Sequence, residues 1–169
     1  GINVESNVLP KSKFKKEKYD IVCSFQVLEH VEDPIEFINE LKSVTNKGGN
    51  IFIEVPNLND PLLEVWDVEK YKTFFYHSAH LHYFTGTSLE KVALKAGFDK
   101  DSIHINYSQD YNLLNHIHWI INNMPQEDCH IGLSKINLQG KNKNISDWLN
   151  KELKILNDKY IKKLVDHKL

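Results

Sequence analysis

The stretch YDIVCSFQVLEHV, residues 19–31, decides how the rest of the chain is interpreted. Its first part, residues 19–25, is a short and nearly continuous apolar run. Such a run is typical of a strand that is buried on both faces of a parallel sheet. The sequence therefore predicts an α/β domain, with a helix soon after residue 31.

That helix has a recognisable start and end. Asp33 suits its N-cap and Pro34 suits its first turn. Residues 47–49, Lys-Gly-Gly, predict its end, and 50–55 is expected to be a second strand. Residues 19–56 should thus form a strand, a helix and a strand in a right-handed parallel crossover. Within the helix, apolar residues recur at helical spacing: Ile35, Ile38, Leu41 and Val44.

The following segment is less regular. Residues 57–80 lack clean periodicity, which predicts a functional loop or lid. Thr87 and Glu90 have the spacing of a capping box, so a second helix is expected over 88–96. Residues 103–107 suggest another strand.

The last third of the chain is expected to be mainly helical. Residues 110–123 fit a helix, and 125–145 are polar and irregular. Ser146 is expected to cap a final amphipathic helix, which could pack on its own domain or on a second copy of the chain. Its apolar stripe comprises Leu149, Leu153, Leu156, Tyr160 and Leu164, and we also expect Tyr111, Trp119 and Trp148 to lie in the core.

Composition restricts the class of protein. The chain has 169 residues, which is enough for one domain, and its 21 lysines against 23 acidic residues give a net charge of -2. This balance argues against nucleic acid as a partner. No apolar run approaches the roughly 18 residues that a membrane span needs. Two distant cysteines without a signal-peptide pattern favour a cytoplasmic protein.

Several motifs in order carry a resemblance. Residues 19–31, Asp33-Pro34, 47–49 and 54–57 (Glu-Val-Pro-Asn) closely resemble the class I S-adenosylmethionine-dependent methyltransferases. His80-Leu81-His82-Tyr83-Phe84-Thr85 and Ala96-Gly97-Phe98 extend the resemblance to about residue 107. It implies a partial Rossmann-like methyltransferase sheet (strands 4 onward) with extra C-terminal helices. It also implies S-adenosylmethionine as cofactor, S-adenosylhomocysteine as product and a small-molecule acceptor.

The resemblance places Tyr19 on the fourth strand of the family's sheet, yet only 18 residues precede it. The family's glycine-rich cofactor turn belongs to the part before that strand. We therefore expect residues 1–107 to be the C-terminal half of a methyltransferase domain. Residues 108–145 would be a helix and an irregular substrate-side segment, and 146–169 a C-terminal amphipathic helix.

Ligands of open parallel sheets bind beyond the carboxyl ends of the strands. By resemblance, Ser24, Phe25 and Gln26 line the cofactor, and Glu29 and His30 close over it. Two structural alternatives stay open. Glu29 also suits a helix N-terminus through the dipole, and His30 could simply hold the turn in place.

By resemblance, His80 is the first choice as general base, because imidazole titrates near neutral pH. His30 and Tyr76 are further catalytic candidates. The alternative is that these rings only pack over the sheet. The expected acceptor-binding residues are Asn57, His77, His82, Tyr83, Asn115 and His116.

A metal site is the alternative to this chemistry. The pairs His80/His82 and His116/His118 could each offer two nitrogens, but no third ligand can be named for either. No metal is therefore predicted.

Three functions compete. The first is methyl transfer by a domain whose front half is missing. The second is a noncatalytic methyltransferase-like remnant that acts as an association module. Either version predicts a homo-oligomer through the sheet edge or the C-terminal helix. A nicotinamide oxidoreductase ranks last, because it also needs a glycine-rich turn at the front.

Overall fold

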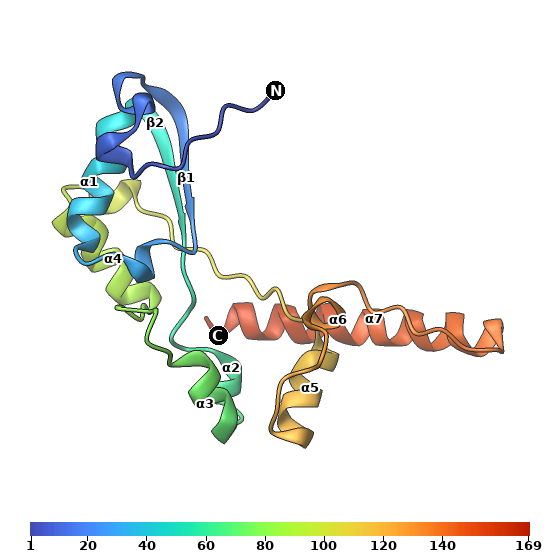
Figure 1. Cartoon of the computed structure of the whole chain (residues 1–169). Helices are drawn as coiled ribbons and strands as arrows, with labels where there is room; N and C mark the ends of the chain where they lie inside the picture. The colour runs from blue at the N-terminus through green and yellow to red at the C-terminus, as the bar shows by residue number, and fades with distance from the viewer. The chain divides into compact units, whose positions relative to one another are not determined.

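The computed structural model describes residues 1–169, with the side chain of Pro10 excepted. The chain divides into two compact units. Unit 1 comprises residues 1–58 and 78–105, and unit 2 comprises residues 59–77 and 106–169. Figure 1 shows the order of the elements along the chain.

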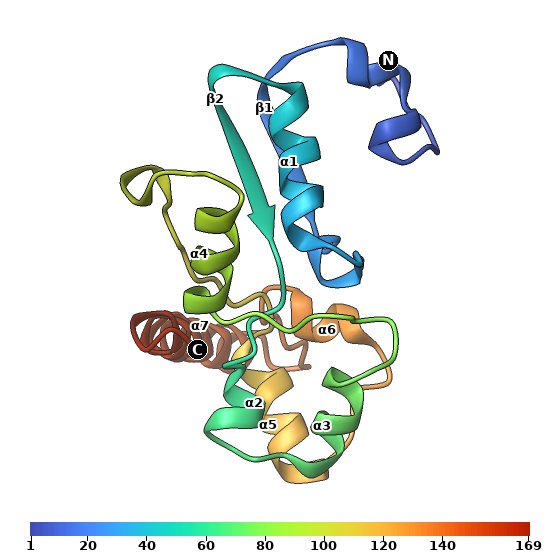
Figure 2. The same ribbon diagram turned by 90° about the vertical axis from the view of Figure 1, so that its left-hand side faces the viewer.

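Unit 1 is built on a parallel pair of strands. Strand β1 (Tyr19–Phe25) pairs with β2 (Thr45–Glu54), and Cys23 lies opposite Phe52 in the register. Helix α1 (Pro34–Val44) connects the two strands, as Figure 2 shows. The predicted strand, helix and parallel strand are confirmed. Short 3-10 helices lie at Leu9–Lys11 (η1), Lys13–Lys16 (η2), Leu28–His30 (η3) and Lys100–Ser102 (η4).

Helix α1 begins as its sequence predicts. The Asp33 carboxylate accepts hydrogen bonds from the backbone N–H groups of Ile35 and Glu36, at 2.8 and 3.0 Å. Pro34 occupies the first turn, where it needs no donor. Residues Ile38, Leu41 and Val44 of this helix are buried.

The expected glycine stop of α1 was wrong. The helix ends at Val44, and β2 begins at Thr45, so Lys47-Gly48-Gly49 lies inside the strand. A Cβ on Gly49 would lie 2.8 Å from the carbonyl oxygen of Asp20. Gly49 is therefore required by the close approach of β1, near the shift in strand register between Tyr19 and Ile21.

The two faces of the sheet differ. One face packs against a core that contains Leu28, Ile38, Phe84 and Ala96. On the other face Ile21, Phe25 and Phe52 are 62%, 58% and 53% exposed. The described part of unit 1 thus covers one face of a sheet whose composition suits burial on both.

Helix α4 (Gly86–Lys95) confirms the predicted helix, but its cap differs. The capping box joins Thr85 to Ser88, where the sequence suggested Thr87 and Glu90. Gly97 follows with a φ of +81°, as a helix-terminating glycine requires.

Residues 103–107 do not form the expected strand. Their alternating exposure fits an extended chain. This segment pairs with neither β1 nor β2, and a β-strand needs a hydrogen-bonded neighbour.

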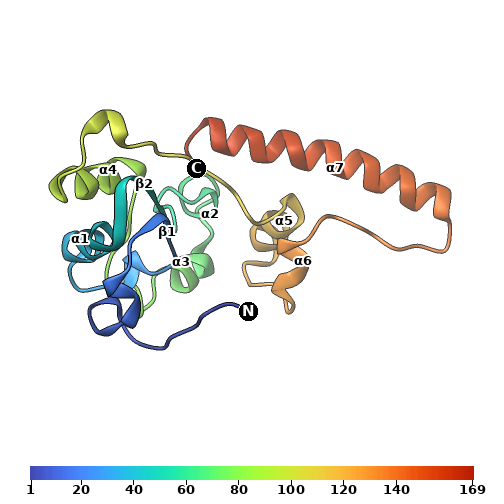
Figure 3. The same cartoon turned by 90° about the horizontal axis from the view of Figure 1, so that it is seen from above.

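Unit 2 is helical within the described residues. Its helices are α2 (Pro61–Glu64), α3 (Glu69–Phe75), α5 (Leu113–Asn122), α6 (Cys129–Leu133) and α7 (Lys143–Asp166). Helix α5 packs against both α6 and α7, which can be followed in Figure 3. The expected loop over 57–80 therefore contains two helices, which are too short to produce a periodic pattern.

The predicted helices α5 and α7 are confirmed, with two corrections in α7. Asn142 caps it by accepting a hydrogen bond from the N–H of Ile145, whereas Ser146 lies inside the helix. Trp148 is 61% exposed and does not belong to the core, because α7 buries only part of its length. Trp119 is buried as expected, and Tyr111 is half-buried. Among the described residues, no helix combines the length and the apolarity that crossing a bilayer requires.

Candidate functional site

The carboxyl end of β1 forms an unusual turn. Ser24 is buried, and its hydroxyl makes no hydrogen bond within the described residues. Gln26 has a φ of +55°, and both its backbone N–H and its side-chain amide donate to Glu54, each at 3.0 Å. Positive φ is costly for a residue other than glycine and is frequent at functional sites. The predicted cofactor residues Ser24, Phe25 and Gln26 thus lie together at this turn.

Next to this turn, η3 is tied to the segment after residue 78. The backbone N–H groups of Leu81 and His82 donate to the carbonyl oxygen of Glu29, at 2.8 and 3.1 Å. The Nδ1 atom of His30 donates to the carbonyl oxygen of Ala79 at 2.7 Å. These bonds place the ring of His80 edge-on to that of His30, with centroids 4.8 Å apart.

Glu29 is the most unusual residue of this cluster. It is 1% exposed, and neither carboxylate oxygen has a hydrogen-bond partner within the described residues. The Nε2 atom of His30 lies 3.8 Å from Oε1, too far for a hydrogen bond. A buried carboxylate without a hydrogen bond is costly, so this group marks the cluster as a functional candidate.

Other predicted residues of unit 1 lie around this cluster. The ring of Tyr83 is 5.6 Å from that of His80. His82 turns instead to the carbonyl oxygen of Glu32, at 3.4 Å from its Nε2. Asn57 forms a backbone bridge with Phe84.

The remaining predicted residues belong to unit 2. Tyr76 and His77 follow α3 and are exposed, and Asn115 and His116 are buried on α5. His116 makes a hydrogen bond of 2.7 Å between its Nδ1 and the hydroxyl of Tyr160. Burial lowers the pKa of His116 to about 4, which keeps its imidazole neutral.

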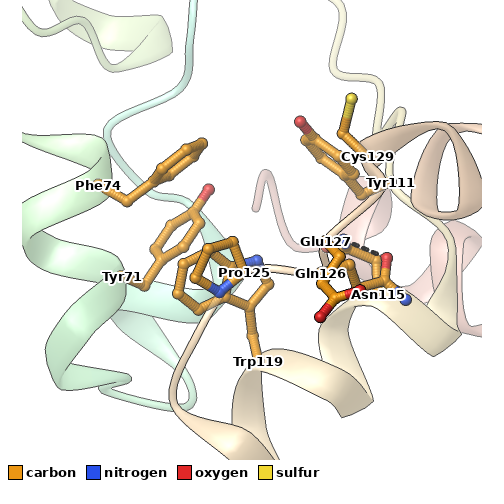
Figure 4. Close-up of a pocket in the computed structure, with 9 residues that line it drawn as sticks. All are labelled: Tyr71, Phe74, Tyr111, Asn115, Trp119, Pro125, Gln126, Glu127 and Cys129. Carbon is orange, nitrogen blue, oxygen red and sulfur yellow. Dashed lines mark hydrogen bonds between the residues drawn. The ribbon is translucent and has the colours of Figure 1, made fainter.

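Unit 2 also contains a cavity of about 210 Å³. Asn115 lines it and donates to the side chain of Gln126 at 2.9 Å, as Figure 4 shows. The ring of Trp119 packs edge-on against Tyr71 in the wall. The full lining comprises Tyr71, Phe74, Tyr111, Asn115, Trp119, Pro125, Gln126, Glu127 and Cys129.

Most of these lining residues were missed by sequence reasoning. Tyr71 and Phe74 lie in the segment interpreted as a loop, and residues 125–129 lie in the stretch described as irregular.

The Asp60 carboxylate accepts a hydrogen bond from the Tyr71 hydroxyl at 3.1 Å, and burial raises the pKa of both groups. The pair Asp60-Pro61, a capping residue before a proline, was the available signal for α2.

Comparison with known proteins supports the family. A model of the methyltransferase domain matches residues 3–103. The ubiquinone biosynthesis O-methyltransferase of Hydrogenovibrio crunogenus is 30% identical over 98 residues, 55% of this chain and 41% of that protein. The mitochondrial ubiquinone biosynthesis O-methyltransferase of Dictyostelium discoideum is 44% identical over 41 residues, 24% of this chain and 13% of that protein.

A third relative, an uncharacterized protein of Methanocaldococcus jannaschii, is 34% identical over 67 residues, 40% of this chain and 33% of that protein. The chain thus spans less than half the length of each of these curated relatives. The family match covers more than half of the chain and includes both strands and the Glu29 cluster. On this evidence, the chain belongs to the class I S-adenosylmethionine-dependent methyltransferases.

Proposed function

We propose that this chain takes part in methyl transfer from S-adenosylmethionine to an oxygen atom of a small-molecule acceptor. The names of two relatives, both O-methyltransferases of ubiquinone biosynthesis, support a hydroxyl acceptor. The observation that carries the proposal is the cluster of Glu29, His30 and His80 beside the turn at the end of β1. It places titratable side chains where a parallel sheet binds its ligands.

The turn at the end of β1 fits the cofactor. The buried Ser24 hydroxyl makes no hydrogen bond within the described residues, so it can bond to a ligand. The exposed Phe25 ring offers an apolar surface. In the proposal, Ser24, Phe25 and Gln26 hold the cofactor, with Glu29 and His30 beside it. S-adenosylmethionine supplies an activated methyl group on a sulfonium sulfur, and S-adenosylhomocysteine is the product.

The acceptor side is assigned to the surroundings of His80. Transfer to a hydroxyl requires that its proton be removed, and we assign this step to His80, with His30 and Tyr76 as further candidates. Asn57, His82 and Tyr83 would orient the acceptor in unit 1. The assignments of His77, Asn115 and His116 to acceptor binding stay predictions.

The proposal includes a partial domain. Residues 1–107 would contain strands 4 onward of a Rossmann-like sheet, with 108–145 on the substrate side and 146–169 as an additional helix. The exposed face formed by Ile21, Phe25 and Phe52 supports this, because doubly wound sheets carry helices on both faces. The free thiols of Cys23 and Cys129 support a cytoplasmic location.

Isothermal titration of this chain with S-adenosylmethionine tests the partial-domain proposal. We expect no binding tighter than about 1 mM, near 4 kcal/mol, because the glycine-rich part of the cofactor site is not among these residues. Micromolar binding by the chain alone would contradict the proposal that the missing half holds the cofactor.

The catalytic assignment is tested in the full-length enzyme. His80→Ala is expected to lower turnover by about a hundredfold or more, because general-base catalysis contributes at least that much. His104→Ala is the matched control, since His104 is exposed and does not belong to the cluster of Glu29, His30 and His80. Unchanged turnover in His80→Ala would remove His80 from the mechanism.

A second function, a noncatalytic association module, is favoured by the exposed apolar sheet face. It predicts that the full-length protein binds a partner chain through this face but transfers no methyl group to any hydroxyl acceptor tested. Turnover that depends on His80 would exclude it.

A further inference from the structure

We propose that Glu29, His30 and His80 form a binding site for a divalent first-row transition metal ion such as Zn²⁺. One carboxylate oxygen and one nitrogen from each imidazole lie within 4.8 Å of one another. This donor set, two histidines and one carboxylate, is one that catalytic zinc and non-haem iron sites use. The proposal is independent of methyl transfer, because metal binding alone can test it.

The orientation of the His30 ring supports the proposal. Its Nδ1 lies 2.7 Å from the carbonyl oxygen of Ala79, which can only accept, so Nδ1 carries the proton. In the neutral ring, Nε2 then has a lone pair directed away from that bond. Histidines that bind metals commonly donate their other N–H to a backbone carbonyl in this way.

The Glu29 carboxylate is the second and independent observation. Its two buried oxygens have no hydrogen bond within the described residues, and Nε2 of His30 lies 3.8 Å from Oε1. When the His30 ring is neutral, its Nε2 lone pair and the Glu29 carboxylate are both acceptors, and neither can satisfy the other. A cation between them would satisfy both groups.

The size and access of the cluster also suit a metal ion. Ligand atoms of a tetrahedral zinc site lie about 3.3 Å apart, since each is about 2 Å from the metal. The present donor atoms lie within 4.8 Å of one another, so binding would require them to move closer together. The half-exposed ring of His30 leaves an entry path, and three protein ligands leave a coordination position open to an oxygen ligand.

Backbone contacts hold the two halves of the site together. The carbonyl oxygen of Glu29 accepts from the N–H groups of Leu81 and His82, so residues 29 and 80 are fixed relative to each other. A bound cation would lower the pKa of a coordinated hydroxyl.

Titration of the metal-free chain with ZnCl₂, followed by isothermal calorimetry, tests the site. We expect one Zn²⁺ to bind at this cluster, and Glu29→Gln and His80→Gln each to weaken that binding by about a hundredfold or more. His82→Gln is the matched control, because His82 contacts Glu32 outside the cluster. Circular dichroism of each variant checks that it is folded.

A second cluster requires its own control. Asp128, Cys129 and His130 lie close together on the surface of unit 2, so Cys129→Ser must leave the affinity of the proposed site unchanged. Cobalt(II) gives an independent readout, because a site without a thiolate produces no sulfur-to-cobalt charge-transfer band. Absence of Zn²⁺ binding, or binding that is lost in Cys129→Ser and kept in Glu29→Gln, would overturn the proposal. A full-length protein that binds Zn²⁺ at this cluster but transfers no methyl group would contradict the proposed function and leave the metal site standing.

Discussion

At the scale of single residues, His116 makes stability depend on pH. It is 1% exposed, and burial lowers its pKa from 6.5 to about 4. Between these values the unfolded chain binds more protons than the folded chain, so stability is complete above about pH 6.5 and falls as the pH drops toward 4. The shift corresponds to about 3 kcal/mol.

Urea unfolding of the wild type and of His116→Gln, at pH 7 and pH 4.5, measures this contribution. Glutamine keeps a polar group near the hydroxyl of Tyr160 and does not titrate. We expect the variant to lose less stability on acidification than the wild type, whereas His130→Gln, at an exposed histidine of the same unit, behaves like the wild type. An equal loss in wild type and His116→Gln would show that other groups carry the acid sensitivity.

At the scale of elements, the cap of α4 is formed by other residues than the sequence suggested. The Thr85 hydroxyl accepts from the N–H of Ser88, and the Ser88 hydroxyl accepts from the N–H of Thr85. Thr85→Ala should therefore lower the free energy of unfolding by about 1 kcal/mol. Thr87→Ala is the matched control and should cost little, because Thr87 is exposed. Chemical denaturation measures the free energy of unfolding of both variants. A larger loss of stability for Thr87→Ala than for Thr85→Ala would show that Thr87 is the capping residue, as the sequence suggested.

Elements with strong local signals could be predicted from the sequence. Asp33-Pro34 and the apolar repeat after it determine the start of α1, and the apolar run of residues 19–25 determines β1. The helices α2 and α3 could not be predicted, because four and seven residues are too few for a periodic pattern. Residues 103–107 show the opposite case: a strand-like sequence forms no strand without a neighbour to pair with.

The candidate site was only partly accessible to the same reasoning. Glu29, His30 and His80 were each singled out, but their proximity depends on hydrogen bonds between segments about 50 residues apart. From sequence, His80 and His82 could offer two nitrogens to a metal, but no third ligand could be named and no metal was predicted. Residues 80–82 are not a strand, and the proposed donor set joins His80 to Glu29 and His30 instead of His82.

At the scale of the whole molecule, the uncovered sheet face has a consequence for association. Ile21 and Phe25 on β1 and Phe52 on β2 share one face, since residues 23 and 52 are opposite each other in the register. Exposed contiguous apolar surface of this kind commonly marks an interaction site. We expect the chain on its own to self-associate through this face. In sedimentation-velocity experiments, its average sedimentation coefficient should increase with protein concentration.

The double variant Ile21→Thr/Phe52→Thr tests this, because threonine keeps a β-branched side chain for the strand and removes most of the apolar surface. Phe25 is left intact because of its proposed role beside the cofactor. We expect the dissociation constant for self-association to rise at least tenfold, about 1.4 kcal/mol. Ile121→Thr is the control, at an exposed residue of α5 in unit 2. If association persists in the double variant and disappears when residues 143–166 are deleted, helix α7 and not the sheet face carries it.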